Sequence, residues 1–121
     1  MCSSDLYGGH AFGFAAEGRS REQEFDLLLK NREKVLPWIR EYSPIELVSK
    51  DDPPLFLEYP KQATKPVLGG KEPDPTHSAM YGIQLQKTCQ TQGVPCDLVY
   101  PDNKSSKFSN SMEFLIQHLA R

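Results

Sequence analysis

The stretch LFLEYPKQATKPVLGGKEPDPTHSAMYGIQLQKTCQTQGVPCDLVY, residues 55–100, decides the fold. It begins with an apolar run over 55–59 and continues through a loop rich in proline and glycine. A helix is expected from about Pro75 to Gln92, and Gly93 suits its end because glycine readily takes the left-handed conformation. A second short apolar run follows over 96–100. The order strand, helix, strand predicts an α/β fold.

The two apolar runs predict neighbouring strands of a parallel sheet. Leu55-Phe56-Leu57 is continuous rather than alternating, which is typical of a strand covered on both faces. The segment between the runs is long enough for a right-handed helical crossover. Two such strands leave unpaired backbone groups at their edges. Further strands would lie upstream, in a second copy, or nowhere, and we expect self-association through the exposed sheet edge.

Helix signals flank this central unit on its N-terminal side. Ser20 and Gln23 form a capping-box pattern, so a helix is expected to begin near Arg21. Pro37 removes a backbone donor and clashes with the preceding turn, so we expect the helix to break there. Ser43-Pro44 then gives another start signal, with proline at the first helical position.

A last helix is expected at the C-terminal end of the chain. Asn110 is suited to cap it, and Glu113 follows three residues later, as in a capping box. The apolar spacing predicts that this helix buries Phe114, Leu115 and Leu119.

The composition excludes several classes of protein. The chain has 121 residues, 38% of them apolar, a net charge of −2 and a pI near 5.9. That length fits one domain at most, and the absence of a basic cluster argues against nucleic-acid partners. No apolar run approaches the roughly 18 residues of a membrane span, and no secretory signal is visible. The three cysteines follow no metal spacing, so reduced thiols and a cytoplasmic location are expected.

The N-terminal part of the chain is expected to have a different character. Residues 1–6 read as the translation of a sequencing adaptor, or as an ordinary disordered N-terminus. Residues 7–18 carry four glycines among aromatic residues and predict a loop.

From Ser43 to Arg121 the sequence resembles the C-terminal part of α/β-hydrolase-fold proteins of the esterase and lipase type. The resemblance rests on an ordered series: Ser43-Pro44, Pro53-Pro54 before the first strand, Asp74 with His77-Ser78, the helix up to Gly93, and the second strand. Residues 7–42 look like the segment over the active site in a subgroup of bacterial members. The implied fold is a partial α/β-hydrolase fold, with its last two parallel strands and flanking helices in residues 43–121.

The resemblance implies that Asp74 is the acid of a Ser-His-Asp triad in a parent that cleaves a small-molecule carboxylic ester. There the carboxylate would orient a histidine and stabilise its imidazolium. Asp52 and Glu72 remain possible substitutes. The alternative for Asp74 is a helix cap with Pro75 at the first helical position.

Other triad parts are missing from the sequence. Gly-x-Ser-x-Gly, the nucleophile elbow, occurs nowhere. The resemblance places the catalytic histidine in 101–110, which contains none, and Phe108 stands near the expected position. His77 is expected at the start of a helix, and His118 in a dipole or surface role. His10, in a Gly8-Gly9-His10 sequence, is expected in a flexible loop.

Three hypotheses follow from these patterns. The first is a fragment of a serine-type ester hydrolase, without cofactor or metal and inactive by itself because the nucleophile is absent. The second is a non-catalytic binding or structural module with a hydrolase-like fold. The third is an independent small α/β domain.

Overall fold

The computed structural model describes residues 18, 20–62, 64–70, 72–74, 77–103 and 107–120, without the side chains of Arg21 and Glu22. The predictions for residues 1–6 and for the loop that contains His10 lie outside these ranges. The chain divides into two compact units, Met1–Leu47 and Val48–Arg121. Within the ranges given, no helix has the length and apolar character needed to cross a membrane.

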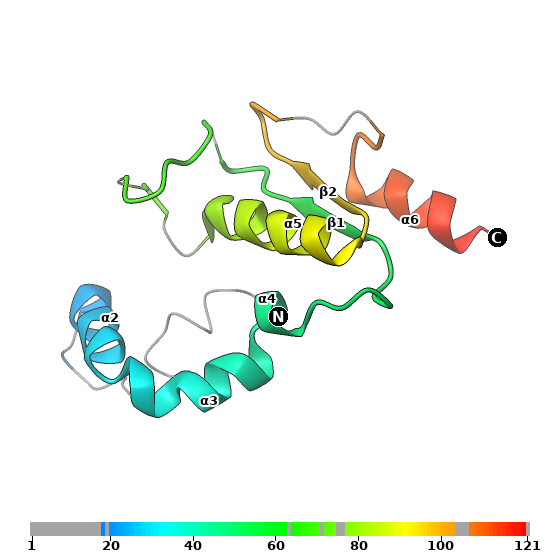
Figure 1. Cartoon of the computed structure of the whole chain (residues 1–121). Coiled ribbons are helices and arrows are strands. Elements are labelled where there is room, and N and C mark those ends of the chain that lie inside the picture. The colour runs from blue at the N-terminus through cyan, green and yellow to red at the C-terminus, as the bar shows by residue number, and fades with distance from the viewer. Residues whose placement is uncertain are drawn as a thin grey trace. The chain divides into compact units, whose positions relative to one another are not determined.

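A two-stranded parallel sheet is the centre of the second unit (Figure 1). Strands β1 (Leu55–Glu58) and β2 (Cys96–Val99) pair in register, with Leu55 opposite Cys96 and Glu58 opposite Val99. Helix α5 (Met80–Gln92) forms the connection between them. The predicted α/β class and the parallel pairing are therefore confirmed. Among the described residues, each strand has a partner on one side only.

One face of the sheet packs against α5. Ala79, Leu98 and Tyr100 are buried there, and Leu57 and Tyr59 pack against them. Alternate residues of β1 point to this face because successive side chains of a strand point to opposite sides.

The other face packs against the C-terminal helix α6 (Ser111–Leu119) through aromatic rings. The ring of Phe56 stacks on Phe114 with centroids 5.4 Å apart, and Phe108 meets both rings edge-on. Both faces of β1 are thus covered, which explains the continuous apolar run. The Asn110 cap is confirmed, since its side chain accepts a hydrogen bond from Glu113 N–H at 2.9 Å.

The prediction for the buried residues of α6 is only partly right. Phe114 is buried, but Leu115 is 45% and Leu119 is 76% exposed. The face of the helix that carries Phe114 and His118 contacts the aromatic rings, so the neighbouring face turns outward. That outward face carries four large apolar side chains, which we call the α6 stripe: Met112, Leu115, Ile116 and Leu119.

The predicted start of α5 is wrong by five residues, because the helix begins at Met80 and its N-cap is Ala79. The cap has no side-chain hydrogen bond of its own. Instead, Ala79 N–H donates to the Gln62 Oε1 atom at 2.9 Å. A residue 17 positions earlier therefore satisfies this backbone donor, which local sequence patterns do not reveal. The end of α5 at Gly93, which has a φ of 76°, is as predicted.

The first unit contains α2 (Arg21–Lys30), α3 (Arg32–Tyr42) and α4 (Pro44–Leu47). The Ser20–Gln23 capping box and the position of Pro44 are confirmed. The break expected at Pro37 is wrong, because Pro37 lies inside α3. The chain breaks at Asn31, where the side-chain amide donates to Leu27 O at 2.9 Å. Pro37 is exposed, so water can satisfy the carbonyl that lacks its donor.

Candidate functional site

The candidate site is a pair of side chains, Asp74 and His77, in the loop that leaves the carboxyl end of β1. The His77 Nδ1 atom lies 2.8 Å from Asp74 Oδ2. Each side chain is about half exposed, His77 at 47% and Asp74 at 49%. In parallel α/β sheets, ligand sites lie outside the carboxyl ends of the strands. The pair therefore occupies the end of the sheet where chemistry is expected.

The roles of the two ring nitrogens depend on the tautomer of His77. An ionised carboxylate can only accept, so the tautomer that hydrogen-bonds to an ionised Asp74 carries its hydrogen on Nδ1. The neutral ring then has its lone pair on Nε2, the nitrogen farther from Asp74. A backbone hydrogen bond from His77 N–H to Asp74 O, at 3.2 Å, closes the turn that brings the two residues together. An imidazole oriented in this way can act as a base or as a nucleophile.

Buried Gln62 anchors this loop to the start of α5. Its Nε2 atom donates to Thr64 O at 2.8 Å and to Glu72 Oε2 at 3.1 Å. Its Oε1 atom accepts from Ala79 N–H. The segments before and after Asp74 and His77 are thus fastened to one side chain. Nothing in the local sequence pattern indicates this role of Gln62, because its bonds to Glu72 and Ala79 join residues that are distant in the sequence.

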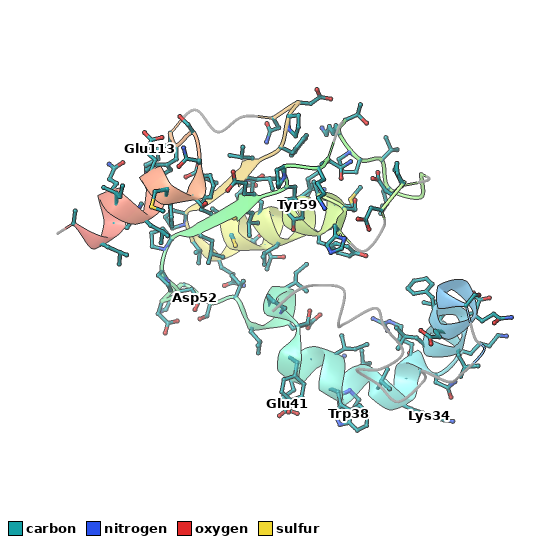
Figure 2. All side chains as sticks on the ribbon, turned by 180° about the vertical axis from the view of Figure 1, so that it is seen from behind. Lys34, Trp38, Glu41, Asp52, Tyr59 and Glu113 are labelled. Carbon is teal, nitrogen blue, oxygen red and sulfur yellow. The ribbon has the colours of Figure 1, made fainter. Side chains whose placement is uncertain are left out.

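The other two acidic candidates have different surroundings. Asp52 lies in the turn before β1, and its carboxylate accepts from Ser49 N–H at 2.9 Å. Figure 2 shows Asp52 and Tyr59 at opposite ends of β1. Glu72 binds the Gln62 amide. Of the three acids, Asp74 is the one whose carboxylate contacts a histidine in the described part of the chain.

Asp74 is not the cap of α5. Helix α5 starts at Met80, with Ala79 as its N-cap. His77 lies before α5, at a position with 3₁₀ conformation. Whether Asp74 caps that turn depends on residues 75–76, which lie outside the described ranges. The three-residue spacing of Asp74 and His77 was the signal in the sequence that could have identified their contact.

The position that the resemblance reserves for the catalytic histidine is part of the core. Phe108 is 1% exposed and packs edge-on against Phe114 at 5.2 Å. His118 is in the last turn of α6, as expected, but it is half-buried rather than on the surface. Its Nδ1–H donates to Phe114 O at 2.8 Å, and its ring lies 4.3 Å from that of Phe114. Both residues stabilise the aromatic cluster under the sheet.

The described thiols are poorly suited to nucleophilic chemistry. Cys89 is fully buried, with 0% exposure. Burial raises the pKa of the neighbouring Cys96 to about 12, and the Cys89 thiol acts in the same direction. Thiolate is the reactive form of cysteine, so Cys96 is held in its unreactive state.

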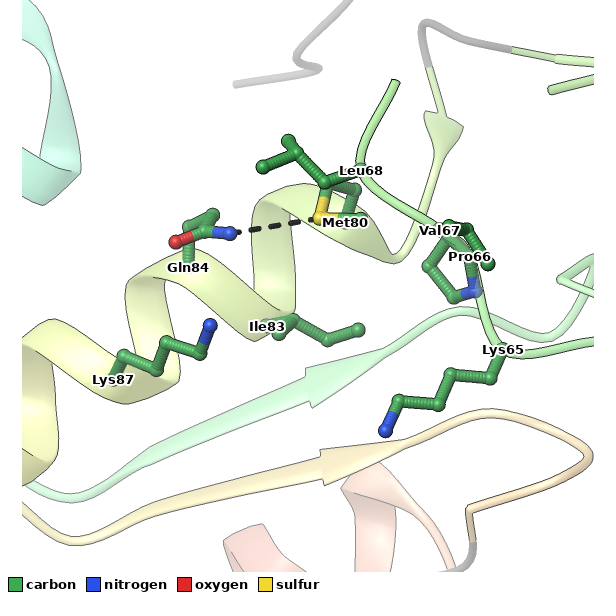
Figure 3. Close-up of a pocket in the computed structure, with 8 residues that line it drawn as sticks. All are labelled: Lys65, Pro66, Val67, Leu68, Met80, Ile83, Gln84 and Lys87. Atoms are coloured by element: carbon green, nitrogen blue, oxygen red, sulfur yellow. Dashed lines mark hydrogen bonds between the residues drawn. The ribbon is translucent and has the colours of Figure 1, made fainter. Parts of the chain in front are cut away.

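An open groove of about 520 Å³ lies between the loop after β1 and one flank of α5 (Figure 3). Its floor and walls are largely apolar, with a lysine from each segment; the lining is Lys65, Pro66, Val67, Leu68, Met80, Ile83, Gln84 and Lys87. Neither Asp74 nor His77 lines it. The groove and the Asp–His pair are separate features of the same loop region.

Within the ranges that the structure describes, no three His, Cys, Asp or Glu side chains are grouped so as to hold a metal ion. No protein-family model, curated protein or solved structure matches this chain.

Proposed function

We propose that this chain supplies the acid loop of an α/β-hydrolase-fold protein that cleaves carboxylic esters, with Asp74 as the acid. One observation supports the proposal: on the loop that follows a parallel strand, the Asp74 carboxylate lies 2.8 Å from the Nδ1 atom of His77. His77 is not at the position that the resemblance assigns to the triad histidine, so the contact shows only that this carboxylate can hold an imidazole. In a catalytic triad the acid orients the histidine through this nitrogen and stabilises the imidazolium. The serine nucleophile would come from sequence upstream of Tyr7.

The packing of the second unit supports a larger sheet. Both strands have an open edge within the described residues, and isolated pairs of strands are marginal in water. The α6 stripe exposes four large apolar side chains on consecutive turns of one helix. A wider sheet with its own helices would cover both features, as hydrophobic burial favours.

Reading the source DNA upstream of the Tyr7 codon is the first test. An open frame that contains Gly-x-Ser-x-Gly after an apolar strand would support the proposal. In the complete protein, Asp74→Asn should lower kcat by about 10⁴, whereas Asp52→Asn should leave it within about twofold. A normal rate in the Asp74 variant would refute the acid role.

Phe108 favours a second candidate function, a non-catalytic binding module. Residues 101–110 contain no histidine, and Phe108, near the position expected for it, is 1% exposed and part of the core. An upstream elbow in which another residue replaces the serine would favour this module over the hydrolase.

A further inference from the structure

We propose that the groove between the loop after β1 and the flank of α5 binds an amphipathic carboxylate, an anion with one carboxylate head and an apolar body. The groove has a volume of about 520 Å³, which lies within the range of about 300–1,000 Å³ that is usual for small-molecule sites. The proposal goes beyond ester hydrolysis, because neither Asp74 nor His77 lines the groove.

The polar side chains of the groove offer positive charge and hydrogen-bond donors. Lys65 comes from the loop and Lys87 from α5, and Figure 3 shows them on either side of Ile83 in this view. The third polar side chain is Gln84, whose Nε2 atom donates to the thioether sulfur of Met80 at 3.6 Å, a weak acceptor. Among the described residues, no acidic side chain lines the groove. A carboxylate, which only accepts hydrogen bonds, complements this set of donors.

Neither lysine of the groove has an ion-pair partner within the described part of the chain. The ion pairs found there are Arg32–Glu33 and Asp74–His77. Lys65 and Lys87 are both exposed, so each ammonium group can reach a ligand from solvent. Two positive charges beside one groove raise the local concentration of anions.

Apolar side chains supply the rest of the lining. Val67 is 71% and Leu68 is 79% exposed on the loop, and Met80 and Ile83 contribute from α5. A ligand with an apolar body would remove these side chains from water, which the hydrophobic effect favours. A small inorganic anion would pair with the lysines and leave the apolar surface hydrated. The lining therefore selects an anion that is also apolar.

Hydrogen bonds of the chain itself hold the loop wall of the groove. Gly70 N–H donates to Val67 O at 2.9 Å, and Gly69 between them has a φ of 78°, as in a tight turn. Near the start of the loop, Gln62 Oε1 accepts from Ala79 N–H at 2.9 Å, which joins the loop to the N-terminal end of α5. Because the two walls are connected in this way, a ligand meets a groove that is already formed.

The surroundings favour a carboxylate over a phosphate. Phosphate sites commonly use free backbone N–H groups at the start of a helix. At the start of α5, Ala79 N–H donates to Gln62 Oε1, and Met80 N–H donates to Ser78 Oγ at 3.2 Å. The donors of the groove come instead from side chains on the flank of the helix.

The test is an amide NMR titration of the full 121-residue chain, labelled with ¹⁵N, with sodium decanoate. We expect a Kd of about 1 mM or below. The largest shift changes should lie at residues 65–68 and 80–87. Decyltrimethylammonium has the same alkyl chain with the opposite charge and should bind at least about tenfold more weakly. Added salt should weaken the binding of decanoate, because ions screen exposed charges.

Variants at exposed positions separate the two parts of the groove. Lys65→Gln and Lys87→Gln should each weaken decanoate binding at least about twofold, and the double variant at least about fivefold. Lys50→Gln makes the same charge change outside the groove and should leave the Kd unchanged. Leu68→Ser should weaken binding about threefold or more. Leu119→Ser is its matched control, since Leu119 is 76% exposed in the α6 stripe, and should have no effect.

Three results would overturn the proposal: equal affinity for decanoate and the decyl cation, an unchanged Kd in the double lysine variant, or shift changes centred on residues 111–119. The last result would mean that decanoate covers the α6 stripe as a detergent does. None of these results depends on the sequence upstream of Tyr7. Failure here would leave the hydrolase proposal standing, and a missing nucleophile elbow would leave the groove as a binding site.

Discussion

Gly82 of α5 lies directly against the ring of Tyr59, which is the first residue after β1. A Cβ atom at Gly82 would come 2.6 Å from Tyr59 Cε2 and 2.7 Å from Leu98 Cδ1. Burial raises the pKa of the Tyr59 phenol above its ordinary value, and a backbone hydrogen bond at Gly82 acts in the opposite direction. The helix thus approaches the sheet so closely that a Cβ atom at this position would have to displace the Tyr59 ring and the Leu98 side chain.

Gly82→Ala is expected to destabilise the second unit by about 1–3 kcal/mol, as overpacking of a core does. Helix propensity alone predicts the opposite sign, a gain of about 1 kcal/mol. Urea unfolding measures the difference. Gln84→Ala, on the groove flank of the same helix, is the control and should change the free energy of unfolding by less than about 0.5 kcal/mol. A more stable Gly82 variant would contradict the close contact.

Phe108→His is expected to produce no serine-type esterase activity and to destabilise the chain by about 2 kcal/mol or more. The imidazole would lie in the aromatic cluster, where an unpaired polar group costs free energy. Phe108→Leu keeps the site apolar and should cost less. Thermal unfolding compares the two variants. If the histidine variant were as stable as the leucine variant, Phe108 would not be a core residue.

Gln62→Glu is expected to cost about 2 kcal/mol, because the lost amide donor leaves two carboxylates facing each other at the Glu72 contact. Glu72→Gln in the same chain should restore part of that loss, since it removes the like charge. The coupling between the two positions is measured by a double-mutant cycle of urea unfolding. Strictly additive effects would show that the Gln62–Glu72 hydrogen bond contributes nothing.

Cys89 and Cys96 are expected to resist a disulfide reagent at about pH 8 in a chain with Cys2 replaced by serine. The raised pKa of Cys96 and the burial of Cys89 keep both unreactive until the chain unfolds. Addition of guanidinium chloride should expose both thiols. Fast labelling of the folded chain would contradict this arrangement.

The raised pKa of Cys96 also makes the free energy of unfolding depend on pH. Between the ordinary pKa of 9.0 and about 12, the unfolded chain releases the Cys96 proton that the folded chain keeps. Stability should therefore fall as pH rises through that window. Cys96→Val should reduce the fall, as measured by thermal unfolding at a series of pH values.

Ile116→Glu is expected to weaken self-association of the chain in sedimentation velocity, because Ile116 is 60% exposed within the α6 stripe. Gln117→Glu adds a negative charge to the same helix outside the stripe and should leave association unchanged. Both variants should retain the thermal stability of the unmodified chain. A monodisperse monomer at every concentration of the unmodified chain would argue against an associating surface.

Local signals predicted much of this fold correctly. The capping pairs at Ser20 and Asn110, the glycine at 93 and the continuous apolar run of β1 each act within a few residues. The wrong prediction at Pro37 also has a local cause. Asn31 rather than Pro37 breaks the first helical segment, because a side-chain hydrogen bond competes with the helix there.

For the candidate site, too, local features were predictable from the sequence and long-range contacts were not. The sequence by itself determined the strand–helix–strand order and the placement of Asp74 after the first strand, because periodicity and capping are local properties. Only the tertiary structure decided that Gln62 fixes both ends of the site loop, that Phe108 fills the core, and that Asp74 contacts His77 and does not cap α5. The physical reason is that these outcomes depend on which distant groups satisfy buried polar atoms and apolar surface, and packing makes that choice.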